Sequence, residues 1–195
     1  MNDENFYGKA FERIKKTKEV LESKVEEMKN DRVAGEDLQP IVYYCSRIKT
    51  PDSMTRKLIG RGFPATPEAA LTKVYDAVGI RIVCSFAGDV QTVVERLEND
   101  PAITVLEKKD YLLRPKPNGY RSVHLCVRAE ETGTLAEIQV RTIAMDFWAT
   151  LEHQLKYKKA VRNEGLIKSE LKRCADEIAS VDLSMQTIRE ILKEI

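Results

Sequence analysis

The segments Arg121-Ser-Val-His-Leu-Cys-Val-Arg-Ala129 and Thr134-Leu-Ala-Glu-Ile-Gln-Val-Arg141 decide the fold of this chain. Apolar and polar side chains alternate along both segments, which is the period of a β-strand with one buried face. Only the short run Glu131-Thr-Gly133 marks a turn between them. A turn of this length predicts that the two strands form an antiparallel hairpin.

The alternation also predicts which side chains share a face of this hairpin. In the second strand three polar residues point to one face and three apolar residues point to the other. In the first strand Tyr120 and His124 point to the same face as each other. If the apolar sets face the core, a carboxylate, an amide, a guanidinium, an imidazole and an aromatic ring line one surface. We interpret this surface as a binding face, although a register shift of one residue would reverse it. The polar set is Glu137, Gln139 and Arg141, and the apolar set is Ala136, Ile138 and Val140.

Further strands and a helix precede the hairpin. The run Ile80-Arg-Ile-Val-Cys84 is rich in β-branched residues, and a second strand is expected within 103–113. Between them, 89–99 has the spacing of a crossover helix. Pro51 begins a short helix after Arg47, and glycines and prolines at 60–67 predict an irregular loop. The fold class is therefore α+β, with a mixed sheet flanked by helices.

Both ends of the chain are expected to be helical. Apolar residues recur at three- and four-residue steps from Glu4 to Asn30, interrupted by Lys18. From Ile167 to Ile195 the spacing is a strict four and three, which is typical of a coiled coil or a tight helix pair. This C-terminal seam packs either on the N-terminal helix of its own subunit or on another subunit. We divide the chain into an N-terminal helix (1–35), a core (36–160) and a C-terminal helix (161–195).

Composition narrows the class of protein. The net charge is only +1, from 32 basic and 31 acidic residues, which argues against a protein built mainly to coat nucleic acid. No apolar run is long enough to span a bilayer and no signal peptide is evident, so a cytoplasmic location without a membrane partner is expected. The cysteines lack the spacing of zinc or redox motifs and are read as reduced thiols. They are Cys45, Cys84, Cys126 and Cys174.

Two acids and one basic segment are the first candidates for chemistry. Asp76 stands just before a predicted strand and Glu137 lies within another, and two such carboxylates suit a divalent cation that also holds phosphates. Among 31 acids such a pair also arises by chance. The segment from Arg47 to Arg61 holds five basic residues and one acid, an arrangement that suits phosphate oxygens but also a solvated face.

Rings and histidines give weaker signals. Tyr120 follows Asn118 and Gly119, so its ring is a candidate for stacking on a base, although an aromatic at a strand start usually packs in the core. His124 and His153 are the only histidines, which excludes a histidine-rich metal cluster.

The order of four motifs resembles the synthetase domain of the RelA/SpoT family. The resemblance covers about 47–157 and, without hydrolase or regulatory regions, points to a single-domain small alarmone synthetase. The motifs are Arg-x-Lys-x-x-x-Ser (47–53), Asp-x-x-Gly-Ile-Arg-Ile (76–82), Asp110-Tyr111 followed by Lys-Pro-Asn-Gly-Tyr-Arg-Ser-Val-His (116–124), and Glu-Ile-Gln-Val-Arg-Thr-Ile-Ala-Met-Asp-Phe-Trp-Ala-Thr-Leu-Glu-His (137–153). Ser46 and Thr50 depart from the glycine and serine common at these positions, and both remain small.

The resemblance implies a nucleotidyltransferase-like fold that transfers pyrophosphate from ATP to the 3′-hydroxyl of GDP or GTP, giving (p)ppGpp and AMP. It implies that Asp76 and Glu137 are catalytic and hold Mg²⁺, and that Glu137 helps to deprotonate the hydroxyl. It also implies a homo-oligomer, with a tetramer suspected. The implied ATP-binding residues are Arg47, Lys49, Ser53, Lys57 and Arg81, and those for GTP or GDP are Tyr120, Lys116, Asn118, His124, Gln139 and Lys109.

Three alternatives remain open from the sequence. The same transfer to an adenosine nucleotide or to the 3′ end of tRNA would keep the chemistry and change the acceptor. A silent nucleotide- or RNA-binding regulator would keep the binding face without turnover. A helical oligomerisation protein would use the sheet only as a scaffold.

Overall fold

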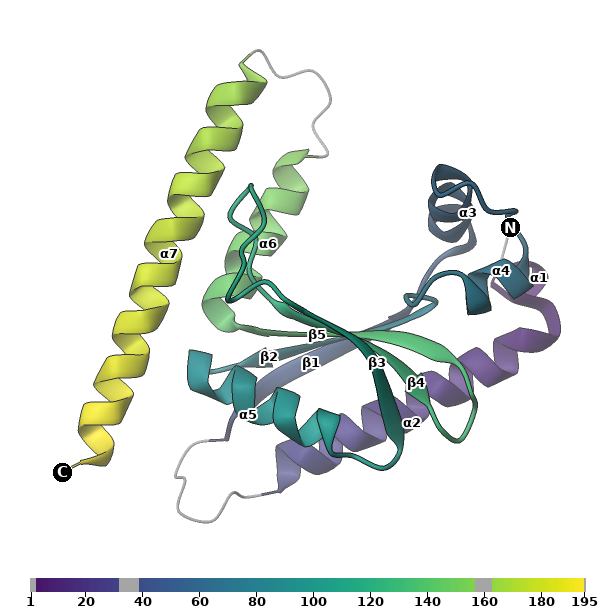
Figure 1. Ribbon diagram of the computed structural model, residues 1–195, viewed down its shortest axis with the longest axis horizontal. Coiled ribbons are helices and arrows are strands. Elements are labelled where there is room, and N and C mark those ends of the chain that lie inside the picture. The colour runs from purple at the N-terminus through teal and green to yellow at the C-terminus, as the bar shows by residue number, and fades with distance from the viewer. Residues whose placement is uncertain (1–2, 32–38, 157–162, 195) are drawn as a thin grey trace.

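The computed structural model describes residues 3–31, 39–156 and 163–194. Its centre is a five-stranded sheet in the order β1-β2-β5-β4-β3 (Figure 1). β2 and β5 are parallel and the other neighbours are antiparallel, so the mixed sheet of an α+β fold is confirmed. The strands are β1 (Ile41–Ile48), β2 (Val78–Cys84), β3 (Ile103–Asp110), β4 (Val123–Ala129) and β5 (Leu135–Thr142).

Helices α2 and α5 pack against the sheet and bury its apolar face (Figure 1). Ala136, Ile138 and Val140 are fully buried there, as the alternation predicts. No helix of the described residues is both long and apolar enough to cross a membrane. The helices are α1 (Asp3–Tyr7), α2 (Phe11–Asn30), α3 (Pro51–Gly60), α4 (Pro67–Thr72), α5 (Ala87–Glu98), α6 (Ile143–Lys156) and α7 (Glu164–Lys193), with a 3-10 turn at Gly8–Ala10.

The hairpin has the predicted register. β4 and β5 are antiparallel, with His124 opposite Gln139 and Cys126 opposite Glu137. The turn between the strands contains Gly133 with φ of +66°, a backbone conformation that favours glycine. The polar side chains of both strands therefore share the face that α2 and α5 leave uncovered.

The N-terminal helix differs from its prediction in two details. The predicted continuous helix is divided by the 3-10 turn at Gly8–Ala10, where Gly8 has a φ of +53°. Where Lys18 interrupts the apolar stripe, Thr17 is the buried residue. Its hydroxyl lies 2.8 Å from the Arg13 carbonyl oxygen and 2.6 Å from the Thr132 hydroxyl, so a polar side chain is satisfied at a core position.

Strand β1 is absent from the sequence prediction. It is an edge strand that pairs only with β2 in the sheet order. Tyr44 and Ser46 are half-buried while Cys45 and Arg47 are exposed, so no apolar alternation marks it. Consequently Arg47 lies on a strand that the sequence did not predict. The helix predicted after Pro51 is confirmed as α3.

Helix α7 packs on α6 and α5 (Figure 1). The prediction that its seam packs on the N-terminal helix is therefore wrong. The side chains that α7 buries are Ala175, Asp182 and Arg189, which are offset from the seam. Asp182 accepts a 2.7 Å hydrogen bond from the Thr142 hydroxyl, and Arg189 pairs with Asp89. Ala175 and the seam residue Ile178 also lie beside Met145 and Trp148 of α6, so apolar contacts in the first half of α7 and polar partners in the second half dock it together.

Candidate active site

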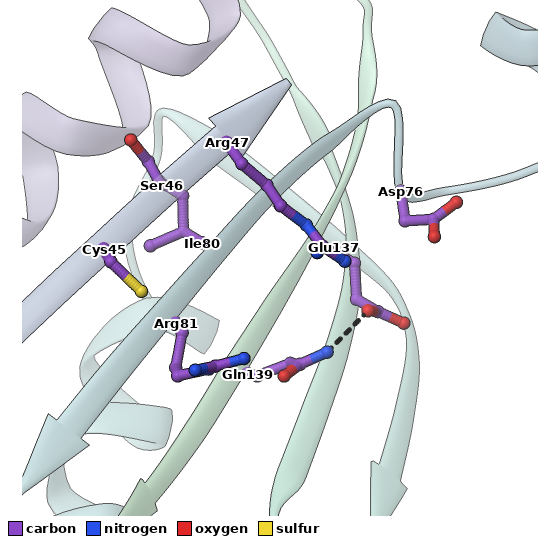
Figure 2. A pocket seen from close by; sticks show the side chains of 9 residues that line it. Cys45, Ser46, Arg47, Asp76, Ile80, Arg81, Glu137 and Gln139 are labelled. Atoms are coloured by element: carbon purple, nitrogen blue, oxygen red, sulfur yellow. Dashed lines mark hydrogen bonds between the residues drawn. The ribbon is translucent and has the colours of Figure 1, made fainter. Parts of the chain in front are cut away.

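A pocket opens on the polar face of the sheet, between β1, β2 and β5 (Figure 2). Register brings its side chains together, because Gly79 of β2 lies between Arg47 of β1 and Glu137 of β5. Since Gly79 has no side chain, the Arg47 side chain lies across it, 3.7 Å from where a Cβ would stand. Two residue pairs further along, and so on the same face of the sheet, Arg81 lies beside Gln139. The pocket therefore places guanidinium groups and a carboxylate on three neighbouring strands.

Asp76 enters the same pocket from the turn before β2. Only 7% of the residue is exposed, and its Oδ2 atom accepts hydrogen bonds from Lys49 (2.8 Å) and Lys57 (2.7 Å). Burial by itself would raise the pKa of Asp76, but the two lysines outweigh burial and lower it. The other oxygen, Oδ1, is buried without a hydrogen-bond partner. A charged carboxylate with one vacant oxygen is suited to bind a cation.

Glu137 is the second carboxylate of the pocket. Its Oε2 accepts a 2.9 Å hydrogen bond from Gln139, and its Oε1 lies 3.5 Å from Nδ1 of His124. Burial raises the pKa of Glu137, but the contacts with His124 and Gln139 more than offset it and bring the pKa to about 2. Gln139 in turn accepts a 2.9 Å hydrogen bond from Arg141. The carboxylate is thus held in one orientation and stays ionised near neutral pH.

An aromatic cluster adjoins Glu137 through His124. The hydroxyl of Tyr120 lies 2.8 Å from Nε2 of His124, and the ring of Tyr111 meets both of their rings edge-on. The Lys116 ammonium lies over the rings of Tyr111 and Tyr120, at 4.6 and 4.7 Å from their centroids. The two rings therefore bind a cation through their faces.

The predicted site residues fall into three groups. Residues of the first group line the pocket. Residues of the second group either contact Asp76 or belong to the aromatic cluster beside Glu137. The third has other partners: Ser53 accepts from Thr50 on α3, Asn118 donates to Glu152, and Lys109 pairs with Glu107 on β3. The first group is Arg47, Asp76, Arg81, Glu137 and Gln139, and the second is Lys49, Lys57, Lys116, Tyr120 and His124.

Sequence reasoning placed Arg141 on the binding face without a specific role and gave no role to Asp146, and both residues lie beside the pocket. Arg141 is fully buried, with its guanidinium 5.9 Å from the Tyr120 ring centroid. Asp146 is in the first turn of α6 and contacts both Arg81 and Arg141. The available signals for Asp146 were its place within the 137–153 motif and in the first turn of the helix that follows β5.

Comparison with known proteins gives consistent matches. The family model described as the region found in RelA / SpoT proteins matches residues 46–162. GTP pyrophosphokinase YwaC of Bacillus subtilis is 38% identical over 157 residues, covering 77% of this chain and 75% of that protein. The crystal structure of small alarmone synthetase 1 from Bacillus subtilis bound to its product pppGpp has a TM-score of 0.81 at 32% identity, covering 91% of this chain and 93% of that one.

The same Bacillus subtilis synthetase has also been solved bound to AMPCPP, with a TM-score of 0.76 at 30% identity and coverage of 94% of this chain and 95% of that one. The family match includes every residue that lines the pocket except Cys45, and it agrees with the extent of 47–157 suggested by the sequence motifs. The chain belongs to the RelA/SpoT family.

Proposed function

We propose that this chain is a GTP pyrophosphokinase, which transfers pyrophosphate from ATP to the 3′-hydroxyl of GDP or GTP and releases AMP. The observation that carries this proposal is the convergence of two ionised carboxylates, Asp76 and Glu137, with two guanidinium groups in one pocket. Family membership and the names of its relatives support the same reaction.

The two carboxylates fit a divalent cation, and we propose Mg²⁺. The vacant Oδ1 of Asp76 is the observation that favours this, because magnesium takes oxygen ligands and is commonly held by one or two carboxylates plus substrate phosphates. Asp76 and Glu137 would hold the ion, and the ion would supply positive charge against the phosphates of ATP.

For the ATP subsite we propose the basic side chains on β1, β2 and α3. Arg47 and Arg81 would stack on adenine, a task for planar guanidinium groups. Lys49 and Lys57 already converge on Asp76, so they lie where the phosphates of a bound donor would need positive charge. Ser53, at the start of α3, would add a hydroxyl donor to a phosphate oxygen.

For the acceptor subsite we propose the cluster around Tyr120. Its ring would stack on guanine after Lys116 moves aside toward a phosphate. His124 and Gln139 connect this cluster to Glu137, so a nucleoside stacked on Tyr120 would hold its ribose near that carboxylate. Asn118 would contact the base edge, and Lys109 would offset phosphate charge from β3.

The chemistry requires the acceptor 3′-oxygen to bond to the β-phosphorus of ATP while the bond from that phosphorus to the bridging oxygen of AMP breaks. A carboxylate with a pKa of about 2 binds a proton weakly. We therefore propose that Glu137 accepts the hydrogen bond of the 3′-hydroxyl, orients it for attack, and relays its proton to solvent as the bond to phosphorus forms. Lys49 and Lys57 would counter the charge on the transferred group.

A transfer assay tests the proposal. Purified protein, Mg²⁺ and ATP labelled on its γ-phosphate are incubated separately with GDP, GTP, GMP, ATP as acceptor, and tRNA. We expect label on the 3′-oxygen of GDP or GTP, and a loss of at least about a hundredfold in Glu137→Gln. If an adenosine nucleotide or tRNA is labelled more strongly than GDP or GTP, that molecule is the acceptor and the proposed guanosine acceptor is wrong. If the protein binds nucleotides but transfers pyrophosphate to none of these acceptors, it is a regulator that acts by binding and not an enzyme.

We also infer that the chain forms a homo-oligomer through the C-terminal seam. Over its second half the seam is exposed, with exposed fractions of 61% for Val181, 50% for Ile188 and 67% for Leu192. Apolar residues in this regular spacing commonly pair with another helix. A second copy of α7 offers the same spacing and is the partner we propose. The predicted tetramer and the division into segments 1–35, 36–160 and 161–195 remain proposals of the same kind.

A further inference from the structure

Asp146 lies between two arginines that face different parts of the site. Its Oδ1 atom is 3.3 Å from an Nη1 atom of Arg81 and 3.5 Å from Nε of Arg141. Its other oxygen, Oδ2, accepts a 2.7 Å hydrogen bond from the hydroxyl of Tyr43 on β1. One carboxylate from α6 therefore contacts side chains of β1, β2 and β5.

The two arginines belong to different subsites. Arg81 lines the pocket beside Arg47, where the donor base is proposed to bind. Arg141 donates to Gln139 and lies 5.9 Å from the centroid of the Tyr120 ring, where the acceptor base is proposed to stack. Asp146 itself is 9% exposed and does not line the pocket. It can therefore act on the nucleotides only through its partners.

The positively charged guanidinium groups of Arg81 and Arg141 lie near each other, and the negative charge of Asp146 reduces their mutual repulsion. Burial lowers the pKa of Arg141, and the nearby charge of Arg81 lowers it further, while Tyr120 and, to a smaller extent, Asp146 raise it. A long side chain also loses rotamer freedom when it is fixed for binding, and that cost is smaller if a partner already holds it. The hydrogen bond from Tyr43 anchors Oδ2 of the carboxylate, while Oδ1 is the oxygen nearest to Arg81 and Arg141.

We propose that Asp146 is a positioning residue that holds Arg81 and Arg141 in place, so that both nucleotide subsites depend on one buried carboxylate. This inference rests on the proposed function. It concerns binding geometry and not the reacting atoms, so its effect belongs in the KM values for both nucleotides more than in kcat.

The test compares Asp146→Asn with Asp182→Asn. The substitutions are identical, and each acid is buried and accepts a 2.7 Å hydrogen bond from one hydroxyl, from Tyr43 and Thr142 respectively. An asparagine at 146 can keep the bond from Tyr43 but loses the charge opposite the arginines. We expect Asp146→Asn to raise KM for ATP and for the guanosine acceptor by about tenfold each, with kcat changed much less. Asp182→Asn should leave both KM values unchanged.

Further variants separate positioning from a merely structural role. If Asp146 acts on ATP through Arg81, adding Asp146→Asn to Arg81→Gln should not raise KM for ATP again but should still raise KM for the acceptor. Tyr43→Phe, which keeps the carboxylate charge and removes its anchor, should raise both KM values in the same direction by a smaller factor. Melting temperatures of all variants identify any loss of folding.

The outcomes distinguish this inference from the proposed function. If the wild-type chain transfers pyrophosphate and Asp146→Asn changes neither KM, or only one of them, the inference is overturned while the function stands. If the wild-type chain transfers nothing, the proposed function fails, and dissociation constants for AMPCPP and GDP measured by calorimetry take the place of KM. Equal affinities in wild type and Asp146→Asn would then overturn the inference as well.

Discussion

Nδ1 of His124 lies 3.5 Å from Oε1 of Glu137, on the face of the sheet that β4 and β5 share. Burial raises the pKa of Glu137, whereas the contacts with His124 and Gln139 lower it from an ordinary value of 4.5 to about 2. His124 makes the larger of these two contributions. Glu137 therefore stays ionised throughout the range in which the protein would work. The histidine lowers the pKa of the carboxylate and also adjoins the acceptor subsite.

His124→Asn should move the acidic limb of the activity profile. Without the histidine the pKa of Glu137 rises toward 4.5, so the carboxylate is protonated at higher pH and loses its capacity to bind a cation or a hydroxyl. We expect kcat/KM measured from about pH 4 to pH 8 to fall earlier on the acid side in this variant. His153→Asn replaces the other histidine, exposed on α6, and should keep the wild-type profile. An unshifted acidic limb in His124→Asn contradicts the assignment.

Tyr120 allows stacking to be separated from hydrogen bonding. Tyr120→Leu removes the ring, and stacking on a base is worth about 1–3 kcal/mol, so KM for the acceptor should rise by about 5–150-fold while KM for ATP stays the same. Tyr120→Phe keeps the ring and loses only the 2.8 Å contact with His124, so its effect should be smaller. Steady-state kinetics with each substrate varied in turn measures both. If Tyr120→Leu raises KM equally for ATP and for the acceptor, Tyr120 does not belong to the acceptor subsite alone.

The sequence predicted those parts of the fold where one face is buried and the other is polar. The hairpin and the shared face of Glu137 and Gln139 follow from strict alternation, because a shift of one residue would bury the charges. Edge strand β1 was missed because it lacks that contrast. The role of Asp146 was out of reach because its contacts with Tyr43 and Arg81 join residues distant in sequence.

The docking of α7 was mispredicted for a related reason. Apolar spacing draws attention to Val181 and Ile188, whereas the residues that pack inward are Ala175, Asp182 and Arg189. Buried polar residues satisfied by distant partners leave no periodic apolar signal. The seam and the docking face are therefore adjacent strips of one helix. The apolar spacing predicted the seam but not the docking face.

Gly119→Ala should disturb the acceptor loop through α7. Gly119 has a φ of +89°, and a Cβ added there would lie 2.5 Å from the Cβ of Ala175 on α7. Backbone strain and this clash act together, so the melting temperature should fall and KM for the acceptor should rise. Gly133→Ala is the matched control, because Gly133 has a φ of +66° but open space around it.

A second substitution distinguishes strain from the clash. Combining Gly119→Ala with Ala175→Gly removes the opposing methyl group, so KM for the acceptor should recover toward the wild-type value while the strain of the positive φ remains. If Gly133→Ala and Gly119→Ala lower the melting temperature equally and neither changes KM, contact with α7 has no influence on the loop.

The exposed half of the seam makes a direct prediction about assembly. Val181→Lys together with Ile188→Lys places two charges on the strip, and burying them between subunits would be costly, so light scattering should report a smaller species. Ser180→Lys with Thr187→Lys has the same seven-residue spacing and the same added charge on an exposed strip of α7 that lies away from the seam. This pair should keep the wild-type mass. Since none of the four side chains is buried within the subunit, circular dichroism should be unchanged in both, and an unaltered mass in the first pair would refute pairing through the seam.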